Sequence, residues 1–582
     1  AFRHCIRDCH TGEEEPLIHH GEELFPKDSS QVLGTVKLAG SARPQISVKG
    51  NMELEPGDNY LWACVTMKEG ASLDGRVVVR PASVVAGNKL VKVANAAPVA
   101  QRIGAAVVRH GDFNSKFYRI PGLARSKKGT LLAVYDIRYN HAGDLPANID
   151  VGVSRSTDGG RTWSDVKIAI DDSKIDPSLG ATKGVGDPAI LVDEKTGRIW
   201  VAAVWSHRHS IWGSKSGDNS PEVCGQLVLA YSDDDGLTWS KPINITEQTK
   251  NKDWRILFNG PGNGICMKDG TLVFAAQYWD GKGVPWSTIV YSKDRGKTWH
   301  CGTGVNQQTT EAQVIELEDG SIMINARCNW GGSRVVGVTK DLGQTWEKHP
   351  TNRTSQLKEP VCQGSLLAVD GVPGAGRVVL FSNPNTTSGR SHMTLKASTN
   401  DAGSWPEDKW LLYDARKGWG YSCLAPVDKN HVGVLYESQG ALNFLKIPYK
   451  DVLKRKKCAL IPFPVTCSTG RFRWRTARFF CFRVFFVKGT WPLLYGLFAA
   501  KDGKLYQEPA PHPFGGKAGG VFLTCFEDAI VRIKGSKSLL QHVSGAEQQA
   551  FGSGNRHIQR PGYFLIGHVF ETAQLNGQPR LF

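Results

Sequence analysis

The chain has 582 residues, of which 64 are Gly and 22% are charged, and its formal net charge is +16 at pH 7. This length allows two or three domains, and abundant Gly with moderate charge is typical of a loop-rich β protein. The 13 Cys residues are odd in number and irregularly spaced, with no C-x-x-C pair, so no disulfide framework or zinc site of that kind is inferred.

The first hundred residues contain short strand-like segments separated by Gly and Pro. This pattern predicts a small antiparallel β-sandwich over residues 1–101. Ala1 is not a Met, and no apolar stretch follows it. No signal peptide is therefore visible, and a truncated or processed start is expected.

One octapeptide pattern recurs four times in the middle of the chain. In each copy a Ser or Thr is followed by Asp at +2, Gly at +4, Thr at +6 and Trp at +7. The copies are residues 156–163, 232–239, 292–299 and 339–346, with a decayed fifth copy at 398–405. Asp and Gly favour turns, so each copy is predicted to be a hairpin turn locked by its Asp carboxylate. The Trp ring is expected to pack in the core of its own repeat unit.

The spacing of these copies predicts the architecture. Successive Trp residues of the octapeptides lie 76, 60, 47 and 59 positions apart, which is near the ~40–50 residues of a four-stranded propeller blade with added loops. Short alternating apolar runs flank the copies, without a long helical period. We therefore predict an all-β chain with a six-bladed β-propeller over residues 102–453. The octapeptides themselves are expected to be scaffold, so function must come from other residues.

Three arginines lie near predicted strand ends of different blades. Arg119 comes just before a strand of the first blade, Arg327 ends the run 322–327, and Arg390 precedes a later strand. Guanidinium groups present paired donors that match a carboxylate, and three of them could hold one planar carboxylate in the central cavity. Each arginine taken alone would more often form a surface ion pair.

The Arg-Ile-Pro element at 119–121, the octapeptides and the two later arginines occur in an order that resembles the bacterial-type exo-α-sialidases (neuraminidases) of glycoside hydrolase family thirty-three. The resemblance covers roughly residues 102–450. It implies a substrate with a terminal sialic acid on a glycoprotein, glycolipid or oligosaccharide, whose carboxylate Arg119, Arg327 and Arg390 would hold. The location of such substrates favours a secreted or periplasmic protein, the chemistry requires no metal and no cofactor, and a monomer is expected.

The resemblance implies the reacting groups as well. Asp144, on a loop 25 positions after Arg119, matches the acid/base, and Asp136 is the competing candidate. Tyr421 matches the nucleophile, and Glu311 matches the base that activates its phenol. A neutral Tyr avoids the repulsion that the substrate's carboxylate would exert on an anionic nucleophile, and sialidases are a known exception to the two-carboxylate rule.

The remaining roles also follow from the resemblance. Glu437 matches the carboxylate that orients the first arginine, and Arg138 with Asp187 match the pair that contacts the 4-hydroxyl of the sugar. Three tryptophans are expected to pack within the blades, with stacking on sugar or closing the rim of the site as alternatives: Trp205, Trp212 and Trp279. A retaining reaction through a sialyl-tyrosine is expected.

Residues 454–582 are predicted to be a basic tail of unclear structure. From residue 452 onward there are 19 Lys/Arg and 6 Asp/Glu, so this part carries +13 of the net charge. Nucleic-acid or anionic-membrane binding by the tail is an alternative, but its conflicting local patterns favour a segment without a stable fold. No nucleic-acid partner and no integral membrane segment are expected.

Two alternatives apply to the propeller. It could transfer sialic acid to another sugar, as a trans-sialidase does, or it could be a non-catalytic carbohydrate-binding module. The predicted N-terminal sandwich has two open roles, carbohydrate binding and bracing of the propeller.

Overall fold

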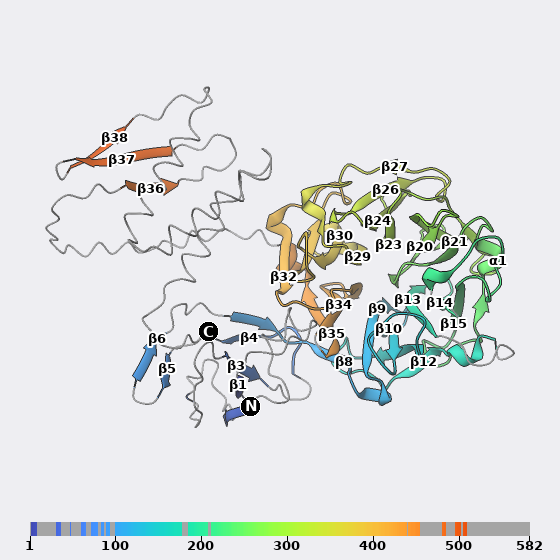
Figure 1. The fold of residues 1–582 in the computed structure, drawn as a ribbon, viewed down its shortest axis with the longest axis horizontal. Coiled ribbons are helices and arrows are strands. Elements are labelled where there is room, and N and C mark those ends of the chain that lie inside the picture. Colours follow the sequence, from blue (N-terminus) through green and yellow to red (C-terminus); the bar gives the residue numbers. More distant parts are fainter. Residues whose placement is uncertain are drawn as a thin grey trace. The chain divides into compact units, whose positions relative to one another are not determined.

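The computed structural model describes residues 99–453, except 177–183, 208–210 and 439. Before this range it describes 2–7, 31–36, 47, 60–65, 71–79, 83–86 and 89–92, and after it 480–484, 495–501 and 504–508. Between strands β8 and β35, six antiparallel sheets surround a central axis as the blades of a propeller (Figure 1). The predicted all-β fold with a six-bladed propeller is confirmed.

Each blade has four main strands, which follow one another from the axis outward. Blade 1 contains β9 (Phe117–Arg125), β10 (Leu131–Arg138), β11 (Ile149–Ser156) and β12 (Lys167–Ile170). Blade 2 contains β13 (Val185–Val192), β14 (Ile199–Trp205), β15 (Gln226–Ser232) and β16 (Ile243–Asn244), and β18 (Gly262–Asn263) pairs with β13. Blade 3 contains β17 (Ile256–Asn259), β20 (Leu272–Trp279), β21 (Pro285–Ser292) and β22 (His300–Cys301), and β19 (Ile265–Cys266) pairs with β20.

The second half of the ring repeats this order. Blade 4 contains β23 (Thr309–Glu316), β24 (Ile322–Cys328), β26 (Val335–Thr339) and β27 (Glu347–Lys348). Blade 5 contains β29 (Ser365–Val372), β30 (Gly376–Pro384), β31 (Met393–Ser398) and β32 (Trp410–Asp414). Blade 6 contains β33 (Ser422–Asp428), β34 (His431–Ser438), β35 (Ala441–Pro448) and β8 (Ala105–Arg109). Short helices α1 (Thr246–Thr249) and α2 (Tyr449–Leu453) and the ladder of β25 (Gly332–Ser333) with β28 (Lys358–Glu359) complete the propeller.

The ring is closed by a strand from the other end of the propeller sequence. Strand β8 precedes blade 1 in the chain but pairs antiparallel with β35, with Val108 opposite Leu442. The last blade thus takes its outer strand from the beginning of the propeller. This pairing covers what would be an open sheet edge and joins the first and last blades by backbone hydrogen bonds.

The octapeptides are the turns between the third and fourth strands of blades 1 to 4. In the first copy, Asp158 Oδ1 accepts hydrogen bonds from Ser156 Oγ at 2.8 Å and from the backbone N–H groups of Arg161 and Thr162, both at 3.0 Å. The Thr162 hydroxyl donates to Asp158 Oδ2 at 2.7 Å. One carboxylate therefore binds four polar groups of the turn, and the Ser156 hydroxyl accepts from the Gly160 backbone N–H at 2.8 Å.

The Trp and Gly of each octapeptide contact the preceding blade. The Trp163 ring of blade 1 packs edge-on against Phe444 of blade 6, with 5.4 Å between ring centroids, and Trp299 of blade 3 packs against Trp200 of blade 2 at 5.8 Å. Gly160 has φ 90° and a β-carbon there would lie 2.0 Å from the Phe444 ring. The expectation that each Trp packs in its own unit holds only in part. The turn lies against the neighbouring blade, and its Trp fills the core between the two, as Trp299 does by meeting Phe274 of its own blade as well as Trp200.

Acid is expected to destabilise the propeller through these turns. Burial is the largest single effect and raises the pKa values of Asp234 and Asp294, but the side-chain and backbone hydrogen bonds of the turn, from Thr238 and Thr298 above all, together lower them to about 2. A carboxylate with a depressed folded-state pKa stabilises the fold above its unfolded pKa of about 3.9 and loses that contribution as the pH falls to the folded value. The melting temperature should therefore fall between about pH 4 and pH 2.

Calorimetry of the Asp294→Asn variant tests this prediction. The variant should melt lower than the wild type at pH 7 and show a smaller decrease between pH 4 and pH 2. The exposed Asp253, changed to Asn, is the matched control and should keep the wild-type pH dependence. An Asp294→Asn protein with the wild-type pH dependence would contradict the assignment.

The described segments on either side of the propeller are also β-strands. Before it, β1 (Phe2–Arg7), β2 (Gln31–Val36) and β3 (Tyr60–Val65) form a sheet in the order β2-β1-β3. Two antiparallel ladders follow, β4 (Arg76–Val79) with β7 (Val99–Arg102) and β5 (Ser83–Ala86) with β6 (Lys89–Lys92).

Residues 460–578 form a separate unit. Its described strands are β36 (Phe480–Val484), β37 (Tyr495–Lys501) and β38 (Lys504–Glu508), which form one sheet in that order. The rest of the predicted basic tail lies outside the described residues. Within the part of the chain that the structure describes, no helix is long and apolar enough to cross a membrane.

Candidate active site

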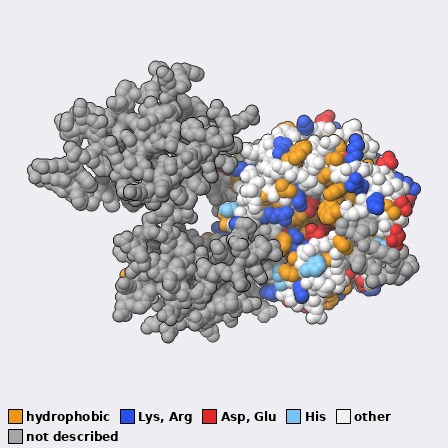
Figure 2. Space-filling model, viewed as in Figure 1, with side chains coloured by type: hydrophobic (Ala, Val, Ile, Leu, Met, Phe, Trp, Pro, Cys, Tyr) orange, Lys and Arg blue, Asp and Glu red, His pale blue; other side chains and the backbone are white. Residues whose placement is uncertain are grey.

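The predicted site residues meet at one end of the propeller axis, where the inner strands begin and the second strands end. Arg119 is the third residue of β9, not a residue before it, and lies opposite Asp136 of β10. Arg327 is the last residue but one of β24. On the face drawn in Figure 2, basic and acidic side chains gather near the centre of the propeller.

Inner strands of three blades carry a β-bulge next to a candidate residue. The register shifts around Ile120-Pro121 in β9, around Asp187-Pro188 in β13 and around Thr310-Glu311 in β23. Ile120 and Asp187 have left-handed φ values of 60° and 55°. Proline suits a bulge because it has no N–H to donate to the ladder, and the extra residue changes the direction of the side chains beside it. The Arg-Ile-Pro and Gly-Asp-Pro sequences thus encode local geometry at the site.

Tyr421 lies at the centre of the site. Its side chain is 5% exposed, and its hydroxyl donates a short hydrogen bond to Glu311 Oε1. Arg327 Nη1 donates to the Tyr421 oxygen at 3.1 Å and to Glu311 Oε2 at 2.7 Å. Burial, followed by the charge of Glu311, raises the pKa of Tyr421 well above its ordinary value, and Arg327 opposes this shift. The phenol is therefore protonated at rest, with a proton acceptor already in contact.

The other two predicted arginines lie against the Tyr421 ring. The guanidinium carbons of Arg119 and Arg390 are 5.4 and 5.5 Å from the ring centroid. Arg390 donates to the backbone carbonyls of Trp419 at 3.0 Å and Val361 at 3.1 Å. Three guanidinium groups from blades 1, 4 and 5 thus lie close to one tyrosine, and such groups suit the binding of a carboxylate.

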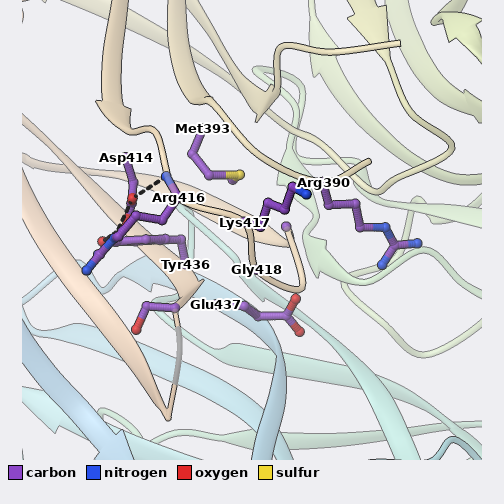
Figure 3. A pocket seen from close by; sticks show the side chains of 10 residues that line it. Arg390, Met393, Asp414, Arg416, Lys417, Gly418, Tyr436 and Glu437 are labelled. Carbon is purple, nitrogen blue, oxygen red and sulfur yellow. Dashed lines mark hydrogen bonds and ion pairs between the residues drawn. The ribbon is translucent and has the colours of Figure 1, made fainter. Parts of the chain in front are cut away.

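Glu437, in β34, connects Arg119 to Tyr421. Its Oε1 accepts from Arg119 Nε and from the Ile120 backbone N–H, both at 3.0 Å. Its Oε2 accepts from the Tyr421 backbone N–H, also at 3.0 Å. Figure 3 shows the Glu437 carboxylate and the Arg390 guanidinium on the same side of a small pocket, opposite the Arg416–Asp414 pair. Glu437 is buried and therefore fixes these groups instead of reaching a ligand.

Arg138 separates two carboxylates with different environments. Its Nη1 donates to Asp144 Oδ1 at 2.8 Å, and its Nη2 donates to Asp136 Oδ2 at 2.8 Å. Asp136 is fully buried, and its second oxygen accepts from the Asp187 backbone N–H at 2.9 Å. The Asp144 side chain is 63% exposed and its Oδ1 lies 4.0 Å from Arg119. Of these two acid/base candidates, Asp144 can therefore reach a bound ligand.

Asp187 lies beside these carboxylates at the start of β13. Its backbone carbonyl accepts from Asn259 Nδ2 at 2.6 Å. Burial, followed by the charges of Asp136, Asp144 and Glu311, raises the pKa of Asp187 well above its ordinary value. Arg138 donates hydrogen bonds to Asp136 and Asp144. Among the interactions described, it affects Asp187 only through its positive charge, which opposes the rise in pKa. A protonated Asp187 is a hydrogen-bond donor.

Two features of the site were not predicted from the sequence. The Trp419 ring lies 4.2 Å from the Arg119 guanidinium carbon, and its only signal in the sequence is an aromatic between two glycines beside Tyr421. Beneath the site, Arg334 and Glu359 form a fully buried ion pair at 3.0 Å. Arg334 also donates to the Cys362 carbonyl at 2.6 Å. No repeat or motif marks this pair.

The three tryptophans with open roles differ in exposure. Trp205 is fully buried in the core between blades 1 and 2, whereas Trp212 is 50% exposed and packs at a tilt against Trp279 with 4.8 Å between ring centroids. Among the described residues, no group of three or more His, Cys, Asp or Glu side chains could hold a metal ion. The groups that meet at the site are a phenol, carboxylates and guanidiniums, which suit proton transfer and attack on an anionic substrate.

This fold and site define a propeller enzyme that acts on an anionic substrate, and comparisons with known proteins agree. Residues 120–403 match the BNR repeat-like domain, and residues 9–90 match the N-terminal domain of BNR-repeat neuraminidase. A sialidase of Bacteroides fragilis is 46% identical over 420 residues, which are 70% of this chain and 77% of that protein. A sialidase of Clostridium perfringens is 34% identical over 363 residues, 59% of this chain and 92% of the relative.

A solved structure leads to the same family. The Hadza microbial sialidase Hz136 superposes with a TM-score of 0.68 and 41% identity, covering 78% of this chain and 90% of that one. The chain belongs to the sialidase family and is an exo-α-sialidase, as its resemblance implied.

Proposed function

We propose that this chain hydrolyses terminal sialic acid from glycoconjugates with retention of configuration, using Tyr421 as the nucleophile. The observation that carries the proposal is the shared hydrogen bonding of Tyr421, Glu311 and Arg327 between two further arginines. A carboxylate held by Arg119, Arg327 and Arg390 would bring the anomeric carbon that bears it next to the Tyr421 hydroxyl.

In the first step Glu311 takes the phenolic proton while Tyr421 Oη forms a bond to the anomeric carbon. The glycosidic C–O bond breaks, and Asp144 gives its proton to the departing oxygen. In the second step Asp144 removes a proton from water, which attacks the anomeric carbon. The bond to Tyr421 breaks, and the phenolate recovers its proton from Glu311.

Arg138 and Asp187 support recognition in this proposal. A partly exposed, protonated Asp187 can donate a hydrogen bond to the 4-hydroxyl of the sugar, whereas Arg138 is buried and acts in this proposal through the carboxylates that it holds. Arg138 also holds Asp144 in position at 2.8 Å.

Proton NMR of the products tests the proposal. With sialyllactose as substrate, free sialic acid should appear first as the α anomer and then mutarotate. A first product with the β configuration would contradict a covalent sialyl-tyrosine, and no release at all would contradict hydrolysis. The same measurement with 4-methylumbelliferyl sialoside as donor and excess added lactose distinguishes hydrolysis from transfer, since transfer would produce sialyllactose.

The Asp144→Asn variant should lose activity in a way that depends on the leaving group. Its kcat/KM for sialyllactose should fall by about 10²–10⁴-fold, because a sugar alkoxide needs a proton to depart. The loss should be much smaller for 4-methylumbelliferyl sialoside, whose leaving phenol is far more acidic. Equal losses for both substrates would argue against Asp144 as the acid.

We also propose a secreted or periplasmic location and a monomeric state. Sialylated glycoproteins, glycolipids and oligosaccharides occur outside the cytoplasm, which supports this location. Cell fractionation with activity assays and light scattering of the purified chain test these two proposals.

A further inference from the structure

Trp419 lies at the rim of the site with an unusual combination of anchoring and exposure. Its indole packs over Arg119 at 4.2 Å, and its backbone carbonyl accepts from Arg390 Nη1 at 3.0 Å. The residue is nevertheless 42% exposed. Gly420 follows it with φ 86°, and a β-carbon there would lie about 3 Å from the Arg390 side chain and from Cys362 Sγ. Trp419 is therefore held in place while part of its surface remains open.

Trp419 and Asp144 flank the same guanidinium. The indole lies against Arg119 at 4.2 Å, whereas Asp144 Oδ1 lies 4.0 Å from Arg119 Nη1. Tyr421 follows Trp419 by two residues and its ring is 5.4 Å from the Arg119 carbon. The exposed indole is therefore beside the groups assigned to nucleophilic attack and to protonation of the leaving group.

The chemistry of the substrate places the leaving group at this point. In a sialoside the anomeric carbon carries both the carboxylate and the glycosidic oxygen. If the arginines hold the carboxylate, the glycosidic oxygen must lie close to them and within reach of Asp144. The first sugar of the leaving group then emerges beside Arg119, the residue over which the partly exposed Trp419 packs. Aromatic side chains bind flat, partly apolar surfaces at low entropic cost when they are already held in place.

We propose that Trp419 forms a binding platform for the first sugar ring of the leaving group. This inference rests on the proposed function, because that function sets where the anomeric carbon lies. The ligand class is a neutral pyranose, such as the galactose unit next to a terminal sialic acid. Trp419 is in this view a specificity residue that favours sialosides with a sugar as leaving group.

Trp212 provides a matched control. It is also exposed and held by an aromatic partner, with Trp279 at 4.8 Å. It belongs to the loop between β14 and β15 of blade 2, near the Asp144 loop because Ile211 and Leu145 share one apolar cluster, but its described ring contact is to Trp279 and not to Arg119. A change at Trp212 should therefore change kcat/KM by the same factor for a sialoside with a second sugar ring and for one without it.

The experiment compares kcat/KM for sialyllactose with kcat/KM for methyl α-sialoside, which has no second ring. Trp419→Ala should lower the ratio of the two by about 3- to 10-fold, the range expected for loss of one aromatic contact. The Trp419→Phe variant should have a ratio close to that of the wild type, and the Trp212→Ala variant should have the same ratio as the wild type. Trp419→Leu, which keeps bulk without an aromatic face, replaces the Ala variant if that variant does not fold.

If Trp419→Ala or Trp419→Leu keeps the wild-type ratio of the two kcat/KM values, the platform proposal is overturned. It is also overturned if Trp212→Ala lowers this ratio and the Trp419 variants do not. Failure of the proposed function would look different, because the wild-type protein would then release no sialic acid from either substrate. Saturation-transfer NMR of sialyllactose bound to the Tyr421→Phe variant gives a second measurement. The galactose protons should receive saturation, and they should lose it when Trp419→Ala is added.

Discussion

Replacing Tyr421 with Phe should abolish turnover and leave sialoside binding almost intact. We expect kcat to fall by on the order of 10³-fold or more, because the variant lacks the hydroxyl that is proposed to form the covalent bond. Binding should survive, since Glu437 contacts the Tyr421 backbone N–H, which Phe retains. The ring that lies between Arg119 and Arg390 is retained as well.

The measurement is kcat with a fluorogenic sialoside, beside calorimetric titration of a non-hydrolysed sialoside. A variant that released sialic acid at the wild-type rate would exclude Tyr421 as nucleophile. Loss of both turnover and binding would instead indicate that the hydroxyl is needed to keep Arg327 in place, since the two are 3.1 Å apart. Melting temperature separates either result from unfolding.

Replacing Glu311 with Gln should lower kcat by about 10²–10⁴-fold, the usual contribution of a general base. Burial and the neighbouring carboxylate raise the pKa of Tyr421 well above its ordinary value, so the phenol does not ionise by itself near neutral pH. Gln keeps the size of the side chain but accepts a proton poorly. It also leaves Arg327 without its anionic partner at 2.7 Å.

Glu316→Gln, at the other end of the same strand β23, is the matched control and should keep wild-type activity. Because Glu311 acts through Tyr421, the double variant with Tyr421→Phe should be no slower than Tyr421→Phe alone. Additive losses in the double variant would show that Glu311 has a separate role, and full activity of Glu311→Gln would exclude it as the base.

The fold was largely predictable because its signals are local. In each octapeptide one Asp binds backbone and hydroxyl groups within four residues, as Asp158 does with Ser156 and Thr162. Such a turn depends little on distant parts of the chain, so its recurrence and spacing predict a propeller of repeated blades. The partner of each Trp was not predictable, because Trp163 meets Phe444 nearly 300 residues later in the chain.

The candidate site was predictable through two kinds of signal. Arg-Ile-Pro at 119–121 and Gly-Asp-Pro at 186–188 mark β-bulges, where proline and a left-handed residue leave the regular ladder. Resemblance to a family then assigned the remaining residues. Trp419 and the buried Arg334–Glu359 pair carry no such signal, since their surroundings are assembled from different blades.

The sequence by itself determined the all-β class, the repeated turns and the residue types that a sialoside needs, because these depend on short-range chemistry and on matched motifs. Only the tertiary structure decided which of those residues meet. Closure of the ring by β8 and β35 brings blades 6 and 1 together, so that Glu437 reaches Arg119 across 318 positions. Burial then sets the different roles of the carboxylates, since Asp136 is enclosed by its partners while Asp144 stays open to a ligand.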